Sequence, residues 1–329
     1  MKITLLMTSL MAAMATLGCS GSAKADASAA ESAADSFTAI ESFSADSAYA
    51  YVAKQTELGP RVPGSEAHRQ CADWITGRLE AFGADTVMQL GAPVAAWDGT
   101  VLPMRNIFAQ YRPELAERII LLSHNDCRHR ADHDPDPTRR TDAIDGANDG
   151  ASGVGVMLEI ARNLGLKRPD IGVDLLFTDL EDYGAREDAN VADSESTWCL
   201  GTQHFAANLP YEAGHLPQWG ILLDMVGGRD AKFRKEYFSL NYAPAPTAKV
   251  WNMARKVGLG DRFVNRTGGA VTDDHLPLIR AGIPVTDIIE TKPDGGFNPT
   301  WHTHQDNIDN IDRNTLGAVG KVVLNLIYN

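Results

Sequence analysis

The sequence predicts an α/β fold, a three-layer sandwich in which helices cover both faces of a mostly parallel central sheet. Two observations support this prediction. Short apolar runs of strand length alternate along the chain with longer segments in which apolar residues recur at helical spacing. The 329 residues, 44% of them hydrophobic and 22% charged, also suffice for one large domain with a substantial core.

The first half of the chain shows this alternation clearly. A helix is expected over 65–82, where apolar residues recur every three or four positions and a glycine follows. Two apolar runs then predict strands over 106–109 and 118–123. A second helix is expected over 150–164, before a further strand over 173–177. A helix between two strands is typical of a parallel sheet.

The second half continues the pattern. An apolar strand is expected over 220–223, and helical periodicity follows over 247–257 and 275–281. The run over 284–289 predicts another strand, and an apolar stripe at helical spacing predicts a closing helix over 314–327. These elements complete the predicted sheet and its two helical layers.

The N-terminus has the features of an export signal. Lys2 precedes an apolar run that ends at Leu17 and is too short to span a bilayer comfortably, which predicts a signal peptide over 1–19. Cys19 lies where a bacterial lipobox places a lipidated cysteine, although Thr16 departs from the usual aliphatic residue. The alternative is plain export with cleavage near Cys19.

The composition changes after this signal. Residues 20–37 are almost all Ala, Ser, Gly, Asp and Glu, which predicts a flexible tether. No further linker-like stretch follows, so we expect 38–329 to form a single catalytic α/β domain. Together these segments predict an exported protein, periplasmic or anchored to the membrane as a bacterial lipoprotein.

Charge and cysteine content limit the function further. The net charge of −13 argues against binding to nucleic acid or to anionic lipid, so we expect no nucleic-acid partner and membrane contact only through an N-terminal lipid anchor. Cys71 falls in a predicted helix and is expected in the core. Cys127 and Cys199 could pair in an oxidising compartment, and the sequence leaves that question open.

Ionisable residues follow three of the predicted strands. His124 follows the strand over 118–123, the pair Glu181 and Asp182 follows the next one, and Asp224 follows 220–223. Open α/β sheets carry their sites just beyond the carboxyl ends of strands. Asp149 adds a carboxylate at the start of a helix; alone it would be read as a helix cap. The joint placement favours a zinc site, since zinc accepts imidazole and carboxylate ligands.

These residues belong to an ordered set of motifs that resembles the M28-type zinc peptidases and their glutaminyl cyclase relatives. The resemblance runs from about Gly59 to the C-terminus and implies the phosphorylase/hydrolase-like fold of zinc exopeptidases. The motifs are His124-Asn125-Asp126, the glycine-rich run 146–153, Glu181-Asp182, 223–227 and Trp301-His302-Thr303.

The resemblance admits two functions. One is a dinuclear aminopeptidase that holds two zinc ions and uses Glu181 as the base for a water molecule. Its metal ligands would be His124, Asp149 (as the bridge), Asp182, Asp224 and His302. The other is a glutaminyl cyclase, which converts an N-terminal glutamine of peptides and proteins to pyroglutamate and releases ammonia.

The cyclase would bind one zinc ion and use Glu181 as the proton shuttle, assisted by Asp224 and Asp273. The ligands of that zinc would be Asp149, Asp182 and His302, with His124 available for a second metal. Trp301 directly before His302, together with Phe297, is similar to the segment that holds glutamine in cyclases, and the stretch 272–285 is also similar. Trp198 is a further substrate-binding candidate. These similarities favour the cyclase.

Two departures from the animal cyclases bear on substrate preference. Those enzymes carry two adjacent glutamates where this chain has Glu181-Asp182, and a histidine where it has Asp287. A function of another class, an inactive surface lipoprotein that only binds, is disfavoured because the acidic set and Glu181 are intact. The loop with His129 and His133 is expected to be solvated, since Pro135 and Pro137 exclude a helix.

Overall fold

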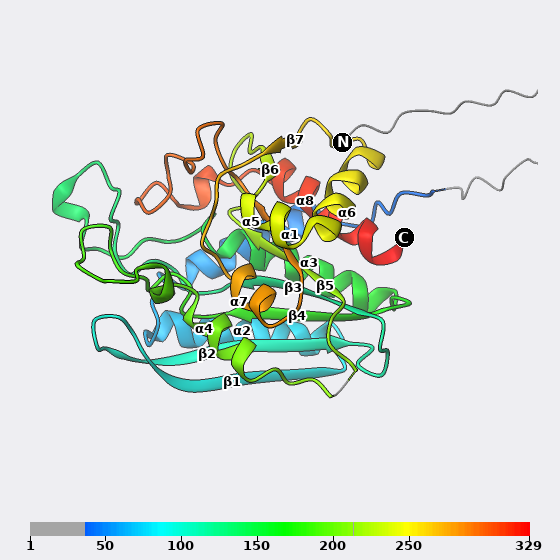
Figure 1. Cartoon of the computed structure of the whole chain (residues 1–329), viewed down its shortest axis with the longest axis horizontal. Coiled ribbons are helices and arrows are strands. Elements are labelled where there is room, and N and C mark those ends of the chain that lie inside the picture. Colours follow the sequence, from blue (N-terminus) through cyan, green and yellow to red (C-terminus); the bar gives the residue numbers. More distant parts are fainter. Residues whose placement is uncertain (1–36, 213) are drawn as a thin grey trace, which may run out of the picture. The chain divides into compact units, whose positions relative to one another are not determined.

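The computed structural model describes residues 37–212 and 214–329 (Figure 1). The predicted signal peptide over 1–19, with Cys19, and all but the last residue of the predicted tether lie outside them. Residues Ala39–Asn329 form one compact unit. Within the described ranges, no helix is both long and apolar enough to cross a membrane.

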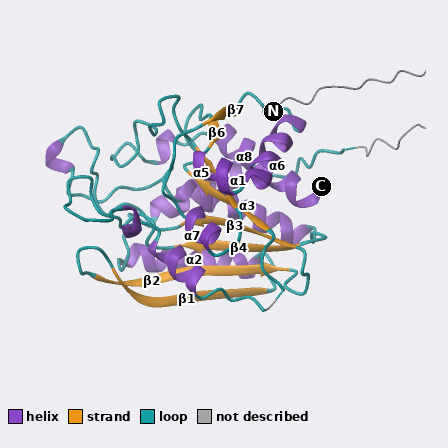
Figure 2. Cartoon of the chain, in the orientation of Figure 1, coloured by secondary structure: helices purple, strands orange, loops and turns teal. Residues whose placement is uncertain are grey.

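A six-stranded sheet in the order β1-β2-β4-β3-β5-β8 forms the centre of this unit (Figure 2). The strands β4, β3, β5 and β8 are parallel, whereas β1 and β2 form an antiparallel hairpin at one edge. The predicted, mostly parallel sheet is therefore confirmed, with this hairpin added. The strands are β1 (Thr86–Ala95), β2 (Val101–Tyr111), β3 (Arg118–His124), β4 (Gly172–Thr178), β5 (Trp219–Asp224) and β8 (Val285–Ile289); β6 (Phe233–Lys235) and β7 (Phe263–Thr267) pair separately.

Helices cover both faces of the sheet, because successive side chains of each buried strand point to opposite faces. Leu121 and Leu175 belong to the larger apolar core, which the long helices cover. Leu122 and Leu176, one position further along, belong to the smaller core under α4 and α7. The helices are α1 (Ala45–Glu57), α2 (Glu66–Ala81), α3 (Ala151–Leu166), α4 (Leu200–Ala207), α5 (Tyr237–Tyr242), α6 (Pro244–Lys256), α7 (His275–Arg280) and α8 (Arg313–Tyr328).

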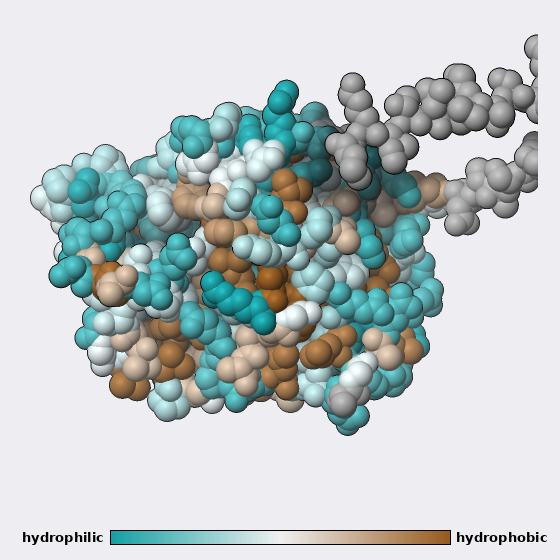
Figure 3. Space-filling model, viewed as in Figure 1, coloured by the Kyte–Doolittle hydropathy of each residue, from teal (hydrophilic) through white to brown (hydrophobic). Residues whose placement is uncertain are grey.

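Local sequence determines where the predicted helices begin. Ser65 caps α2, since its hydroxyl accepts a hydrogen bond from the main-chain N–H of His68 at 3.1 Å. Asp312 caps α8 in the same way through the N–H of Asn314. Exposed large hydrophobic side chains, such as Leu166 and Tyr242, are spread over different elements, and the face drawn in Figure 3 mixes hydrophilic residues with small hydrophobic patches.

The carboxyl ends of the central strands meet at one edge of the sheet. His124 is the last residue of β3 and lies opposite Thr178, the last residue of β4. Asp224 ends β5 and pairs with Ile289, the last residue of β8. The sheet thus delivers residues from four neighbouring strands to one place, as expected from the sequence.

Candidate active site

A cavity of about 240 Å³ opens at this edge of the sheet. It collects the three predicted catalytic residues, the three predicted metal ligands and the three predicted substrate-binding residues. His124, the predicted ligand of a second metal, lies beneath it and is fully buried. The nine predicted residues that line it are Asp149, Glu181, Asp182, Trp198, Asp224, Asp273, Phe297, Trp301 and His302.

Two carboxylates and one imidazole converge at the floor of the cavity. His302 Nε2 lies 3.1 Å from Asp182 Oδ1 and 3.5 Å from Asp149 Oδ2. All three side chains are buried. Despite these short separations, neither oxygen of Asp182 nor Oδ2 of Asp149 is in a well-aligned hydrogen bond.

This group fits a zinc ion. Buried carboxylate oxygens without hydrogen bonds are costly unless a cation compensates them. An imidazole and two carboxylates supply three ligands of the kinds zinc prefers, leaving a fourth position for a reacting molecule. Burial raises the pKa of Asp182, and the charge of Asp149 adds to that rise. A divalent cation at this point would offset both effects.

His124 connects a second set of carboxylates directly below. Its Nε2 lies 3.1 Å from Asp149 Oδ1 and 3.2 Å from Asp224 Oδ1. Asp149 therefore faces His302 through one oxygen and His124 through the other. Burial alone would lower the pKa of His124, but its bonds to Asp126, Asp149 and Asp224 raise it well above its ordinary value.

Main-chain geometry aims these side chains at the cavity. Leu180, Met225 and His302 have φ angles of 55°, 46° and 53°, in the left-handed region that residues other than glycine rarely adopt. Leu180 precedes Glu181, and Met225 follows the last residue of β5. Such strain is characteristic of functional sites, where surrounding structure holds the backbone in place.

Two buried carboxylates outside the predicted set support the main chain of the site. Asp126 accepts hydrogen bonds from the N–H groups of Glu181 and Asp182 at 3.3 and 3.1 Å. Asp306 accepts from those of Asn148 and Asp149 at 2.7 and 3.0 Å. Burial raises the pKa of Asp306 to about 7, and the charge of Asp149 contributes. Sequence reasoning quoted Asp126 only as part of a motif and missed Asp306.

Glu181 lines the cavity next to the predicted zinc ligand Asp182. It is 8% exposed, and the thiol of Cys199 donates a weak hydrogen bond to its Oε1 at 3.5 Å. One oxygen or sulfur atom each of Glu181, Cys199 and Asp273 lies within 4.8 Å of the others. Burial, reinforced by the charges of Asp273 and Asp182, raises the pKa of Glu181 well above its ordinary value despite the opposing effect of His124.

A further buried acid, Asp287, lies close to Asp273. Asp287 is fully buried, and neither of its side-chain oxygens is in a hydrogen bond. Asp273, His275 and Asp287 bring their polar atoms within 4.8 Å of one another. Burial, together with the charges of Asp273 and Glu236, raises the pKa of Asp287 well above its ordinary value.

An apolar wall of aromatic side chains faces the acids. The rings of Phe297 and Trp301 lie 4.6 Å apart, and both pack against the core residues Met225, Val271 and Ile289. Trp198 stacks over His302 at 6.2 Å with an interplanar angle of 12°. The cavity is therefore acidic on one side and apolar on the other.

The cysteines are not part of a nucleophilic site. Cys71, Cys127 and Cys199 are all buried free thiols, so no disulfide joins Cys127 to Cys199. Cys127 donates to the carbonyl oxygen of Ile144 at 3.3 Å, and burial raises the pKa of its thiol. No described residue is hydrogen-bonded to this thiol as a base would be.

Comparisons with known proteins agree with this geometry. The model of peptidase family M28 matches residues 106–327. The glutaminyl-peptide cyclotransferase of Bos taurus is 26% identical over 295 residues, covering 81% of this chain and 76% of that protein.

Solved bacterial structures are closer. The glutaminyl cyclase of Bacteroides thetaiotaomicron, bound to N-acetylhistamine, is 47% identical with a TM-score of 0.86, over 89% of this chain and 99% of that one. A Zn-dependent exopeptidase from Parabacteroides distasonis is 49% identical with a TM-score of 0.85, over 88% and 100%. The similarity therefore extends over nearly the whole described chain.

Proposed function

The chain belongs to peptidase family M28, and we propose that it is a glutaminyl-peptide cyclotransferase within that family. It catalyses cyclisation of an N-terminal glutamine of peptides and proteins to pyroglutamate with release of ammonia. The observation that carries this function is the cavity itself. It combines the cluster of Asp149, Asp182 and His302, the carboxyl of Glu181 and the apolar wall of Trp301 in a volume that suits one short side chain.

The reaction needs one group that moves a proton. The α-amine nitrogen attacks the side-chain amide carbon, so a ring C–N bond forms while the bond to the amide nitrogen breaks. Glu181 accepts a proton from the attacking amine and returns it to the departing nitrogen, which leaves as ammonia. Its place in the cavity, beside Asp182 in the chain and next to Asp273 in space, suits this role.

The remaining lining residues orient the reactants. Asp273 and Asp224 face the cavity and are assigned the positioning of Glu181 and of the substrate amine. Trp301, Phe297 and Trp198 supply the apolar surface that holds the glutamine side chain in a conformation ready for ring closure. Holding two groups of one molecule together in this way lowers the entropic part of the barrier.

The chain's own residues would hold a single zinc ion through Asp149, Asp182 and His302. When bound there, zinc supplies a Lewis acid that polarises the glutamine amide and stabilises developing negative charge. We assign one ion rather than two because the sequence motifs resemble those of the single-zinc cyclases.

A dinuclear aminopeptidase is the second candidate. The observation that favours it is the cluster of His124, Asp149 and Asp224, whose polar atoms lie within 4.8 Å of one another and would serve a second metal. In that enzyme Glu181 would activate water instead of an amine. The comparisons with cyclases fit this candidate less well.

The place of action follows from the N-terminal sequence. We assign the chain to the exported fraction, with the signal sequence cleaved off before Cys19 and Cys19, as the new N-terminus, carrying a lipid that anchors the domain. Its substrates would then be exported peptides and proteins that begin with glutamine after processing.

A comparison of two peptides tests the function. The purified mature domain is incubated with a Gln-initiated and a Leu-initiated peptide of otherwise identical sequence, and both are followed by mass spectrometry. We expect the Gln peptide to lose the mass of one ammonia and the Leu peptide to stay intact. Release of free leucine would move the assignment to the aminopeptidase.

A further inference from the structure

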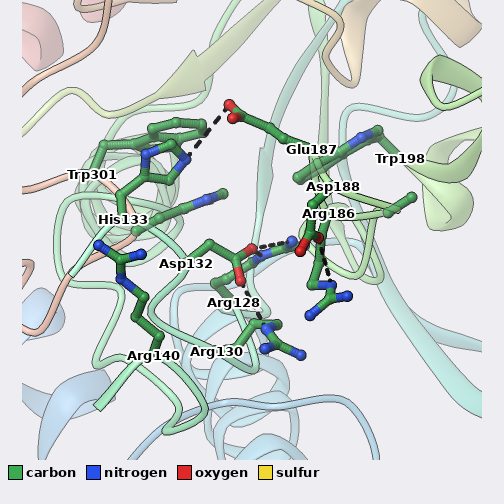
Figure 4. A pocket seen from close by; sticks show the side chains of 12 residues that line it. Arg128, Arg130, Asp132, His133, Arg140, Arg186, Glu187, Asp188, Trp198 and Trp301 are labelled. Atoms are coloured by element: carbon green, nitrogen blue, oxygen red, sulfur yellow. Dashed lines mark hydrogen bonds and ion pairs between the residues drawn. The ribbon is translucent and has the colours of Figure 1, made fainter. Parts of the chain in front are cut away.

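A second cavity, of about 440 Å³, adjoins the active site (Figure 4). Trp198, Trp301 and His302 line both cavities. Trp301 separates them: its ring lies 4.6 Å from Phe297, which lines the active-site cavity, and 4.6 Å from His133, which lines the second one.

The loop over 128–140 forms much of this second cavity, and His133 and residues 135–140 are exposed, as expected of a solvated loop. The prolines do exclude a long helix, but the loop is held to the domain by Asp134. That buried carboxylate accepts hydrogen bonds from the main-chain N–H and Nδ1 of His304 at 3.0 and 2.7 Å. The attachment places one side of the exposed His133 ring against Trp301.

The lining of this cavity is rich in arginine, although the chain as a whole has a net charge of −13. Three carboxylates face the four guanidinium groups, so positive charge is in excess even with the histidines left aside. The arginines are Arg128, Arg130, Arg140 and Arg186, and the acids are Asp132, Glu187 and Asp188.

The ion pairs leave Arg140 without an acidic partner. Asp132 is shared by Arg128 and Arg130, and Asp188 lies 3.1 Å from Nε of Arg186. Arg140 donates its Nε–H to the carbonyl oxygen of Asp134 at 2.7 Å and forms no ion pair within the described residues. In Figure 4 its guanidinium group lies below His133, on the side of Trp301, and no dashed line reaches it.

The second cavity adjoins the active site, so its position determines which residues of a bound peptide can contact it. Trp198, Trp301 and His302 form the rim that the two cavities share, and each residue of an extended peptide advances the chain by up to about 3.5 Å. A substrate whose backbone leaves the active site over this rim brings its second and third residues next to the arginines. A guanidinium group with free N–H donors suits a carboxylate, which it can bind through two parallel hydrogen bonds.

We propose that this cavity is a subsite for an acidic side chain at the second or third position of the substrate, with Arg140 as its specificity residue. The proposal rests on the cyclase function described above. It makes peptides that begin Gln-Glu or Gln-Asp the preferred substrates, and peptides with lysine at the same position the poorest.

The test compares kcat/KM for three peptides that differ only at the second position, Gln-Glu, Gln-Ala and Gln-Lys, with a matching set that varies the third. Because the cavity is open to solvent, an Arg–carboxylate pair there is worth a modest preference, and we expect about twofold to fivefold for Glu over Ala at one of the two positions. Arg140→Gln should bring that ratio close to one, and Arg140→Glu should favour lysine. High salt should weaken the preference of the parent enzyme.

Arg255→Gln provides the matched control. Arg255 is also exposed, and it lines a different cavity together with Trp219, the first residue of β5, at the opposite end of the strand from Asp224. This variant should keep the full preference. Equal kcat/KM for the acidic, neutral and basic peptides, or a preference that survives Arg140→Gln, would overturn the subsite. Failure to cyclise any of the Gln peptides would instead overturn the cyclase function.

Discussion

Asp306 Oδ2 accepts the main-chain N–H of Asp149 at 3.0 Å, joining two residues that lie 157 positions apart in the chain. Its other oxygen accepts the N–H of Asn148 at 2.7 Å. One buried side chain thus fixes the main chain at the start of the segment that delivers a predicted zinc ligand.

Asp306→Asn should therefore weaken zinc binding without touching a ligand. The amide keeps one acceptor but presents an N–H group to one of the two main-chain N–H donors. We expect zinc affinity to fall by about ten- to a hundredfold, as for other changes that reorient ligands. Competition with a chelator measures it. Asp309→Asn, an exposed change three residues away, is the control, and equal affinities for both variants would contradict the supporting role.

Glu181→Gln should abolish proton transfer while leaving the zinc ligands in place. General acid–base catalysis contributes about 10²–10⁴-fold, so we expect kcat for ammonia release to fall by that factor. Zinc content, measured on the same sample, should remain that of the parent. If the variant carries its full zinc content and still retains more than a tenth of the parent kcat, Glu181 is not the proton shuttle.

Gly150→Ala should destabilise the domain more than an ordinary glycine replacement. Gly150 has a φ of 92°, and a Cβ there would lie 2.7 Å from the carbonyl oxygen of Asp126 and 2.9 Å from Cε1 of His124. Gly83→Ala is the control, since its φ of 72° is also positive but nothing lies within 4 Å. We expect Gly150→Ala to lower the free energy of unfolding by about 2 kcal/mol more. If denaturant titrations give both variants the same loss of unfolding free energy, the neighbouring atoms must move to make room for the Cβ of residue 150.

Asp287 should make the stability of the domain depend on pH. The pKa of Asp287 is raised in the folded protein. Its contribution to the free energy of unfolding is therefore complete below the unfolded pKa, about 3.9, and is lost as the pH rises through the folded pKa. Asp287→Asn cannot ionise and avoids this loss. We expect the variant to gain stability relative to the parent, by about 1 kcal/mol or more, between about pH 5 and pH 8.

Denaturant unfolding at several pH values measures that difference. Asp261→Asn, an exposed change, should leave the pH dependence as in the parent. A constant difference between the Asp287 variant and the parent across this range would mean that Asp287 does not change its charge there.

Elements with strong periodicity were predictable from the sequence. The helix expected over 65–82 is α2, and the strand expected over 118–123 is β3. The strand β1 was missed because Gly91 and Pro93 interrupt its pattern. It tolerates them because it lies at the edge of the sheet, where Pro93 pairs with Pro103.

The site was predictable where its residues follow strands, and less so elsewhere. Glu181 and Asp224 follow β4 and end β5, so the sheet itself brings them together. The support by Asp306 and the attachment of Asp134 to His304 depend on contacts between distant segments, which no local pattern encodes. For the same reason the sequence correctly indicated a solvated loop around His133 but not the contact of His133 with Trp301.

The central claim is that one zinc ion at Asp149, Asp182 and His302 suffices for cyclisation. It is tested most directly by removing metal from the enzyme, adding zinc in steps and following ammonia release from a Gln-initiated peptide. The account predicts that activity reaches its maximum at one zinc per chain, with no release of leucine from a Leu-initiated peptide at any step. Activity that appears only as a second zinc binds, accompanied by free leucine, would contradict it and assign His124 to a second metal.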